Sequence, residues 1–389
     1  MSSVPPEGAI GAKLLVSGRR VVRVAIEPRK MLRLGAILVG RPAGEALGTL
    51  PHLFSLCGTA QLQAGLEAVE RACGISVAPA QRGARRVLLL AETVLEHAQR
   101  LLIDWPPLVG LDPNLAEAKA LRQALTGLRG LMGPEAPWAQ PGGVPLAIDH
   151  DALEARLSEA LAILRRAVYG PQWEEGGDFG QWVNSQATLP ARLLYVMAER
   201  GWSDLGKSEV APMGEFAADE LARRLEEDAD GAYARAPDWQ GQVYETGPIA
   251  RLAVHPVIMG LRAKIGNGAA LRLVARMIEL TRRMRDLIAM APGLEHDTPA
   301  PARLGSGSGL AMVEAARGRL AHRVELADGV VTRWQILAPT EWNFHPQGAF
   351  AKGVLGLEAG PDLETRARLI GTAIDPCVAL EVTIEAADA

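Results

Sequence analysis

The sequence predicts a predominantly helical α+β fold, with β-hairpins near both ends of the chain and long helices between them. Apolar and polar residues alternate around Ser17-Gly18 and around Asp328-Gly329, which is typical of two strands joined by a tight turn. The expected hairpins cover 12–28 and 322–339. Apolar residues recur at helical spacing in the middle of the chain, which predicts helices within 85–104, 151–168, 214–236 and 256–292.

The domain organisation follows from length and from one interruption in the pattern. The chain has 389 residues, of which 48% are hydrophobic and 22% charged, enough to bury a substantial core. Proline and glycine gather within 132–149, and no other segment looks as much like a linker. We expect a surface loop at 132–149 inside a single domain that covers 1–389.

The composition excludes several classes of protein. The formal net charge is only −4, and the eight tryptophans do not interleave with a basic stripe, so nucleic-acid binding has no support. The N-terminal region has no signal-peptide pattern, and no uncharged apolar run is long enough to cross a bilayer. Three cysteines without a secretion signal are typical of reduced thiols. We expect a cytoplasmic protein that binds neither membranes nor nucleic acid.

The first cysteine stands at the entrance of a predicted helix that Thr59 can cap and Gly74 can end. Cys73 falls on the apolar stripe of that helix, so we expect it in the core as a small apolar side chain. Cys57 lies before the cap and off the stripe. Unpaired N–H groups and the helix dipole favour a thiolate there, and the thiolate is the species that binds metal.

The third cysteine shows a similar local pattern near the C-terminus. In the segment "IDPCVALEV", Asp375 can act as a helix N-cap and Pro376 as the first helical residue, which would place Cys377 in the first turn. The sequence therefore predicts two cysteines at helix entrances, and a metal or redox role is one interpretation of that arrangement.

The two cysteine motifs resemble those of the nickel–iron hydrogenase large subunit. "HLFSLCGTAQ" resembles Arg-x-Cys-Gly-x-Cys-x-x-x-His, and "DPCVALEVT" resembles Asp-Pro-Cys-x-x-Cys-x-x-His. Cys57 and Cys377 retain one cysteine of each pair, whereas Phe54 and Leu380 replace the others and Gln61 replaces a histidine. The segments "YETGPIARL", "VEAARGRLAHRV" and "PTEWNFHPQG" resemble further large-subunit segments in the same order, so the resemblance covers essentially the whole chain.

The resemblance implies a large-subunit-like fold and a degraded metal site. In the enzymes four cysteines hold a nickel and an iron, and the iron carries two cyanides and one carbonyl. The resemblance leaves Cys57 and Cys377 as metal ligands, and an arginine fork suits anionic cyanide. Because Phe54 and Leu380 donate no sulfur, we expect no nickel and no hydrogenase turnover. The residues implied around the cofactor are Arg317, Asp375, Glu96 and Glu7.

This combination is similar to the HupK/HoxV family of hydrogenase expression/formation proteins. The resemblance implies a non-catalytic scaffold that transiently carries an Fe(CN)2(CO) unit on Cys57 and Cys377 during hydrogenase maturation. The partners implied are the hydrogenase large-subunit precursor and a small iron-delivery chaperone. The chain ends soon after Thr383, so no cleavable extension is expected.

Two alternatives stay open from the sequence. One is a divergent metal-binding enzyme or hydrogen sensor that uses another ion, with help from Glu96, His97 or His345. The other is a structural relative that keeps the fold to dock partners and whose thiols are inert. Both histidines are more simply explained as structural residues.

Overall fold

The computed structural model describes residues 8–27, 34–54, 56–133, 140–170, 178–300 and 302–387. The strands are β1 (Ala9–Ser17), β2 (Arg20–Glu27), β3 (Ala211–Pro212), β4 (Tyr244–Glu245), β5 (Gly307–Ala315), β6 (Gly318–Ala327), β7 (Val330–Leu337) and β8 (Ala379–Ala386). The helices are α1 (Leu34–Leu38), α2 (Ala43–Leu53), α3 (Gly58–Ala72), α4 (Pro79–Gln99), α5 (Leu115–Thr126), α6 (His150–Leu164), α7 (Phe179–Ser185), α8 (Leu189–Glu199), α9 (Ala218–Glu227), α10 (Ala232–Arg235), α11 (Pro248–Arg251), α12 (Pro256–Ile265), α13 (Ala269–Met290), α14 (Pro339–Asn343), α15 (Ala349–Val354) and α16 (Leu363–Ile374). Shorter turns are the π-helical η1 (Arg100–Asp104) and η4 (Arg165–Tyr169) and the 3-10 turns η2 (Pro106–Val109), η3 (Gly127–Leu131) and η5 (Ala291–Gly293).

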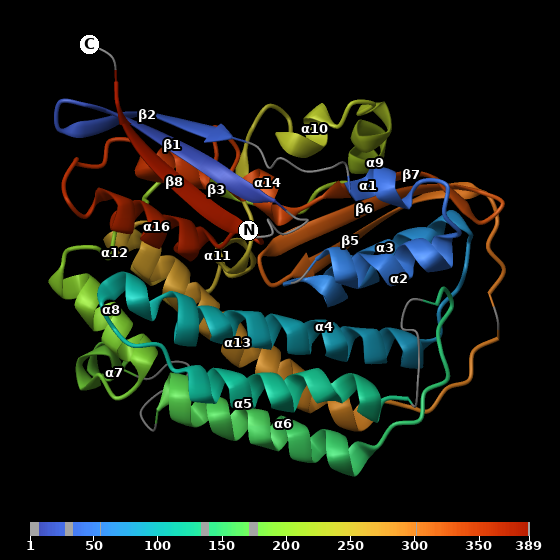
Figure 1. Ribbon diagram of the computed structural model, residues 1–389. Coiled ribbons are helices and arrows are strands. Elements are labelled where there is room, and N and C mark those ends of the chain that lie inside the picture. Colours follow the sequence, from blue (N-terminus) through green and yellow to red (C-terminus); the bar gives the residue numbers. More distant parts are fainter. Residues whose placement is uncertain are drawn as a thin grey trace, which may run out of the picture.

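The two ends of the chain meet in one sheet with the strand order β2-β1-β8. β1 pairs with β2 as the predicted hairpin, and β8 lies parallel to β1 with Ala9 opposite Ala379. Figure 1 shows these three strands together at the top left of the view, above α16. Ile10, Ala12 and Leu14 alternate into a core shared with α15 and α16. The N-terminal and C-terminal segments of the chain therefore lie side by side.

The second predicted hairpin is also confirmed. β6 and β7 are joined at Asp328-Gly329, where both residues have positive φ, and β5 completes an antiparallel sheet β5-β6-β7. α3 lies directly across β5 and β6 (Figure 1). A Cβ atom on Gly309 would lie 2.2 Å from the Ala68 carbonyl oxygen, so glycine at this point allows the close approach. This packing sets the position of the start of α3, where Cys57 lies.

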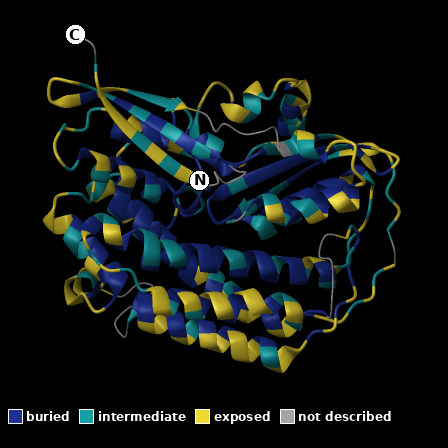
Figure 2. Cartoon of the chain, in the orientation of Figure 1, coloured by how far each residue is buried: buried dark blue, intermediate teal, exposed yellow. Residues whose placement is uncertain are grey.

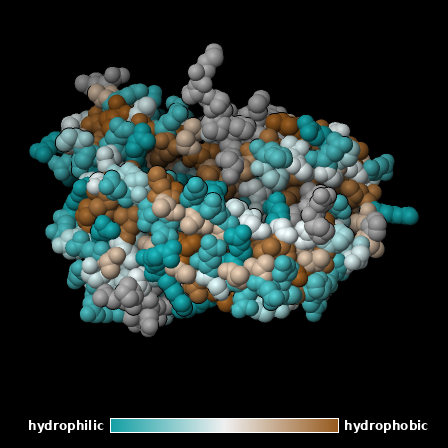
Figure 3. All heavy atoms as spheres, turned by 60° about the horizontal axis from the view of Figure 1, so that its bottom comes forward, coloured by the Kyte–Doolittle hydropathy of each residue, from teal (hydrophilic) through white to brown (hydrophobic). Residues whose placement is uncertain are grey.

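The predicted long helices form the interior. α4 and α13 pack against each other and are buried along most of their length, while α5 and α6 cover them from outside (Figure 2). Figure 3 views the molecule from this outer side, where hydrophilic side chains surround scattered hydrophobic ones. The apolar run at Val87–Leu90 explains why α4 is an interior helix. None of the described helices is long and apolar enough to cross a membrane.

The proline-rich and glycine-rich segment 132–149 carries no helix in its described parts. Its apolar side chains nevertheless contribute to the core, because Met132, Val144 and Ile148 are buried. Leu146 forms an isolated antiparallel bridge with Asp297. The described part of this segment therefore has buried residues that attach it to the interior and exposed residues between them.

The prediction of a helix that begins after Asp375 is wrong. α16 ends before Asp375, which is its C-cap at φ +71°, and the chain then turns through Cys377 into β8. Proline is common both at the first position of a helix and just after the end of one, so the local pattern fits either arrangement. Here Pro376 follows the end of a helix.

Candidate functional site

Cys57 is the N-cap residue of α3 and is buried, with 6% of its surface exposed. The expected cap by Thr59 is replaced by a carboxylate from α4, because Glu92 accepts hydrogen bonds from the backbone N–H groups of Thr59 (2.7 Å) and Ala60 (3.0 Å). Burial raises the pKa of Glu92 to about 7, although these two hydrogen bonds act in the opposite direction.

Cys377 is equally buried, with 5% exposed, in the turn between α16 and β8. Its backbone N–H donates to the Thr340 hydroxyl oxygen at 3.2 Å. Because β8 is held by β1 and α16 by the core, the turn that carries Cys377 is fixed from both sides. The cysteine is therefore placed by tertiary packing and not by a helix entrance.

The fold brings the two cysteines together although 320 positions separate them (377 − 57). Their thiols are hydrogen-bonded to each other, and this contact, together with burial, raises the pKa of Cys57 well above its ordinary value. At neutral pH the Cys57 sulfur therefore keeps its proton, in contrast to the thiolate expected for a helix entrance. A metal that binds the Cys57 sulfur must displace this proton.

A small cavity adjoins the two thiols. Its volume is about 10 Å³, close to the space one water molecule needs, and its walls include Cys57, Cys377, Arg317, Gln61 and Pro339. The Gln61 side-chain amide donates to the Cys57 sulfur at 3.7 Å. The cavity is too small for a metal with several diatomic ligands, so such cargo requires the walls to move apart.

Arg317 lies in the turn between β5 and β6 and is 2% exposed. Its Nη2 donates to Glu96 at 3.0 Å, and its Nε donates to Asp375 at 3.2 Å and to the Pro376 carbonyl at 3.3 Å. Nη1 is buried and has no hydrogen-bond partner among the residues that the structure describes. A buried arginine that leaves one donor unused beside a cavity is suited to an anion or another strong acceptor.

The three segments that resemble large-subunit motifs outside the cysteine regions converge on this turn. Thr246 accepts a hydrogen bond from the backbone N–H of Arg319 at 3.0 Å, and its own N–H donates to Asn343 at 2.9 Å. Gly318 has φ +134°, and a Cβ there would lie 2.5 Å from Thr246. These segments therefore shape the turn that presents Arg317.

Asp375 is surrounded by three arginines. Its Oδ1 lies 2.6 Å from Arg100 Nε and 3.2 Å from Arg317 Nε, and its Oδ2 lies 3.3 Å from Arg276 Nη2. Burial alone would raise the pKa of Asp375, but the charges of Arg100, Arg317 and Arg276 outweigh it and hold that pKa below its usual range. The predicted residues Arg317, Glu96 and Asp375 thus form one network. Arg100 and Arg276 belong to it, and the sequence did not single them out.

The two histidines considered as alternative ligands do not line the cysteine cavity. His97 Nε2 lies 3.0 Å from Glu279 Oε2, and burial lowers the pKa of His97 to about 4. His345 lies between α14 and α15, where burial lowers its pKa and Asp238 acts against that shift. Within the described residues, no group of three or more His, Cys, Asp or Glu side chains is arranged to hold a metal.

The residues that replace the other cysteines also lie away from the cavity walls. Phe54 is buried in the large core, and Leu380 packs on Gly371 in the core beneath the β2-β1-β8 sheet. Cys73, expected in the core, is half-buried against it, and its sulfur accepts from the Gly305 N–H at 3.5 Å. Glu7 lies outside the described residues.

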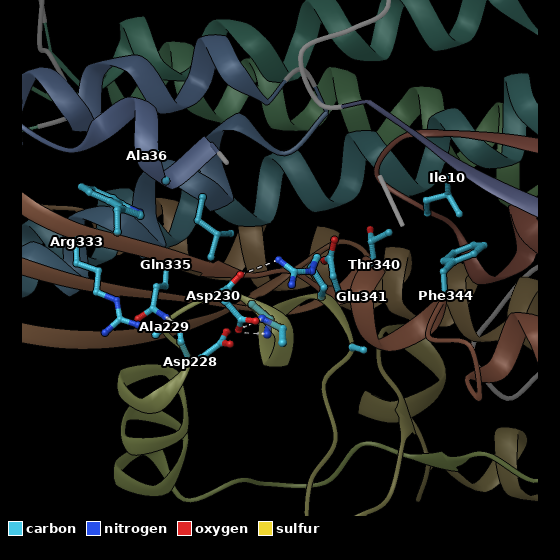
Figure 4. Close-up of a pocket in the computed structure, with 18 of the residues that line it drawn as sticks. Ile10, Ala36, Asp228, Ala229, Asp230, Arg333, Gln335, Thr340, Glu341 and Phe344 are labelled. Carbon is cyan, nitrogen blue, oxygen red and sulfur yellow. Dashed lines mark hydrogen bonds between the residues drawn. The ribbon is translucent and has the colours of Figure 1, made fainter. Parts of the chain in front are cut away.

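A larger cleft of about 560 Å³ lies on the other side of Thr340. Figure 4 shows Arg333 and Gln335 of β7 on one side, Asp228 and Asp230 from the connection between α9 and α10 below, and Thr340 with Phe344 at the far end. Thr340 therefore lines the cleft while its hydroxyl binds the backbone of Cys377, and Pro339 beside it lines the cysteine cavity.

Comparisons with known proteins agree with this architecture. The family model of nickel-dependent hydrogenases matches residues 261–379. The hydrogenase expression/formation protein HupK of Bradyrhizobium diazoefficiens is 35% identical, with 93% of each chain covered. The hydrogenase expression/formation protein HoxV of Cupriavidus necator is 33% identical, with 88% of each chain covered.

Among solved structures, the nickel–iron–selenium hydrogenase of Desulfovibrio vulgaris Hildenborough matches with a TM-score of 0.71 at 19% identity, covering 96% of this chain and 97% of that one. This structural match shows the hydrogenase large-subunit fold, and the fold expectation is confirmed. The sequence matches to HupK and HoxV extend over most of both chains. The chain therefore belongs to the family of hydrogenase expression/formation proteins that includes HupK and HoxV.

Proposed function

We propose that this hydrogenase expression/formation protein is a non-catalytic scaffold that carries an Fe(CN)2(CO) unit during nickel–iron hydrogenase maturation. Cys57 and Cys377 are the protein ligands of the iron in this proposal. The observation that carries it is the hydrogen-bonded pair of buried thiols beside Arg317 Nη1, a buried donor without a partner in the described part of the chain.

The two cysteines and Arg317 suit a metal ion that already carries most of its ligands when it binds. Two thiolates alone leave a bare divalent ion short of protein ligands, since structural zinc sites take four. Iron that already carries two cyanides and a carbonyl needs only a few protein ligands. Arg317 Nη1 is the donor that would bind a cyanide nitrogen, and Glu96 and Asp375 hold the guanidinium in place.

The same geometry argues against nickel chemistry. Phe54 and Leu380 supply no sulfur and do not line the cavity, so nickel would lack the thiolates that bind it in the enzymes. The chain would therefore hold the iron unit without turning over hydrogen.

Cargo must reach sulfurs that are 6% and 5% exposed. Pro339 and Thr340 separate the cysteine cavity from the larger cleft, and movement of this pair would join the two spaces. The small iron-delivery chaperone and the hydrogenase large-subunit precursor are the proposed partners, bound transiently in the cytoplasm. Crosslinking in cells that assemble active hydrogenase should capture one or both of them.

Infrared spectroscopy tests the ligands directly. Protein purified without oxygen, from cells that contain the maturation machinery, should show cyanide and carbonyl stretching bands. Cys57→Ser and Cys377→Ser should each abolish the bands, because a neutral hydroxyl is a poor substitute for a thiolate on this iron. Cys73→Ala is the matched control and should keep them, since Cys73 does not line the cavity.

Results that contradict these expectations would distinguish the scaffold from the two alternative functions. Bands that survive both serine variants and vanish in Cys73→Ala would disprove the ligand assignment. Metal analysis that finds a different ion in stoichiometric amount, without infrared bands, would favour a divergent metal-binding enzyme or hydrogen sensor. A metal-free protein that still crosslinks to the large-subunit precursor would favour a docking relative with inert thiols.

A further inference from the structure

Three hydrogen bonds connect the β5-β6-β7 sheet to the Cys57 sulfur. Trp334 Nε1 donates to His322 Nδ1 at 3.1 Å, His322 Nε2 lies 2.7 Å from Gln61 Oε1, and Gln61 Nε2 donates to Cys57 Sγ at 3.7 Å. The three connecting side chains are buried, with Gln61 2%, His322 0% and Trp334 4% exposed. Water therefore does not compete for these contacts.

The chemistry of the tryptophan gives this chain of hydrogen bonds one direction. An indole N–H can only donate, so the His322 Nδ1 that faces it must be the unprotonated nitrogen. The ring proton then lies on Nε2 and is donated to Gln61 Oε1. Because the amide oxygen of Gln61 is occupied in this way, its NH2 group faces the sulfur.

The packing of α3 on the sheet holds these groups in contact. The rings of His322 and Trp334 meet edge to face with centroids 5.9 Å apart. Gly65 follows Gln61 by one helical turn, and a Cβ there would lie 2.8 Å from Trp334 Cζ2 and 3.3 Å from His322 Nδ1. The absence of a side chain at Gly65 lets both rings lie against the helix beside Gln61.

We propose that Gln61, oriented by His322 and Trp334, is a positioning residue that keeps an N–H donor on the Cys57 sulfur in the loaded protein. This inference rests on the proposed function, in which Cys57 binds iron. A hydrogen bond to a metal-bound thiolate draws electron density from the sulfur and fixes the direction of its remaining lone pairs. The iron then receives less charge from sulfur and passes less of it to the carbonyl.

The carbonyl stretching band of the loaded protein reports this effect. Gln61→Leu removes the donor, so the sulfur donates more strongly and the band should move to lower wavenumber. Loss of a hydrogen bond to a charged sulfur should also weaken retention of the iron unit by about tenfold.

The role of His322 and Trp334 in orienting Gln61 needs a separate variant. Trp334→Phe removes the indole N–H that selects the His322 ring form, so the carbonyl band should split or broaden as Gln61 loses its single orientation. Trp182→Phe is the matched control. It removes another buried indole N–H, one that donates to the Tyr169 carbonyl at 2.6 Å, and should leave the band unchanged.

Metal-free protein provides an independent measurement. Selective ¹⁵N labelling of the seven histidines should show His322 with its proton on Nε2, and Trp334→Phe should abolish this preference. A proton on Nδ1 in the unmodified chain would overturn the inference. Bands that are present but unmoved by Gln61→Leu would also overturn it, while leaving the proposed function intact. Absence of all bands from the unmodified protein would overturn both.

Discussion

Replacing Asp375 with asparagine tests how the buried charges around the cysteine site are balanced. Asp375 has φ +71°, a left-handed conformation that asparagine tolerates about as well as aspartate. Asp375→Asn therefore keeps the backbone and the side-chain shape and removes only the negative charge. The three arginines that face this carboxylate lose their common counter-ion.

The size of the effect follows from burial. Arg276 and Asp375 are each 2% exposed, so water cannot replace the carboxylate without rearrangement. Within the described residues, Arg276 Nε and Nη1 have no hydrogen-bond partner that could compensate for its loss. Breaking a buried ion pair by removing one partner typically costs about 3–5 kcal/mol. We expect Asp375→Asn to lower the free energy of unfolding by about that amount at neutral pH.

The assay is urea unfolding followed by circular dichroism, with the slope of the transition as a check that the same surface is exposed. Asp204→Asn is the matched control. Asp204 pairs with Lys207 at 2.9 Å, but their side chains are 52% and 49% exposed, so the change should cost about 0–1 kcal/mol.

The pH dependence gives a second check on Asp375. Its pKa is lowered in the folded state, so its contribution is present above the unfolded pKa of about 3.9 and is lost as pH falls through the folded pKa. The difference between the unmodified protein and Asp375→Asn should therefore shrink on acidification below about pH 4. If the two proteins had equal stability at pH 7, the reasoning from buried charge would be refuted.

Two further predictions concern the surroundings of the site. Because the folded pKa of Glu92 is about 7 and its ordinary value is 4.5, stability should fall as pH rises between these values by at most about 3 kcal/mol, and Glu92→Gln should remove that slope in pH-dependent urea unfolding. An unchanged slope would show that Glu92 titrates normally. Gly318→Ala introduces strain at φ +134° and a Cβ 2.5 Å from Thr246, so it should cost about 3 kcal/mol. Gly48→Ala, at an exposed helical position with open space, should instead gain about 0.5–1 kcal/mol, and equal thermal shifts for the two would contradict the packing argument.

Local periodicity was sufficient to predict the hairpins and the long helices. The turns at Ser17-Gly18 and Asp328-Gly329 have residues that accept positive φ, and the apolar spacing in α4 and α13 is set by helix geometry. The segment after Asp375 was predicted wrongly because the same residues can begin or end a helix. Only the long-range pairing of β8 with β1 decides between the two, and no local pattern contains it.

The candidate site also contains some residues that local sequence patterns reveal and others that they do not. Cys57, Cys377 and Arg317 could be found because they lie in short motifs. Arg100 and Arg276 lie on helical segments whose apolar spacing looks ordinary. Periodicity does not show that Arg276 is buried or that Arg100 reaches Asp375. The carboxylate of Glu96, one residue from His97 on α4, was linked to the site through resemblance and not through spacing.

The parallel pairing of β1 with β8 also affects how the chain can fold while it is being synthesised. Ribosomes release the N-terminal hairpin early, and until β8 arrives the outer edge of β1 has no neighbouring strand. An unpaired edge of this kind can recruit other chains, which makes the nascent protein a candidate client for chaperones. Cys377 joins Cys57 only after translation has passed residue 377, so a nascent chain can present one thiol long before the pair exists.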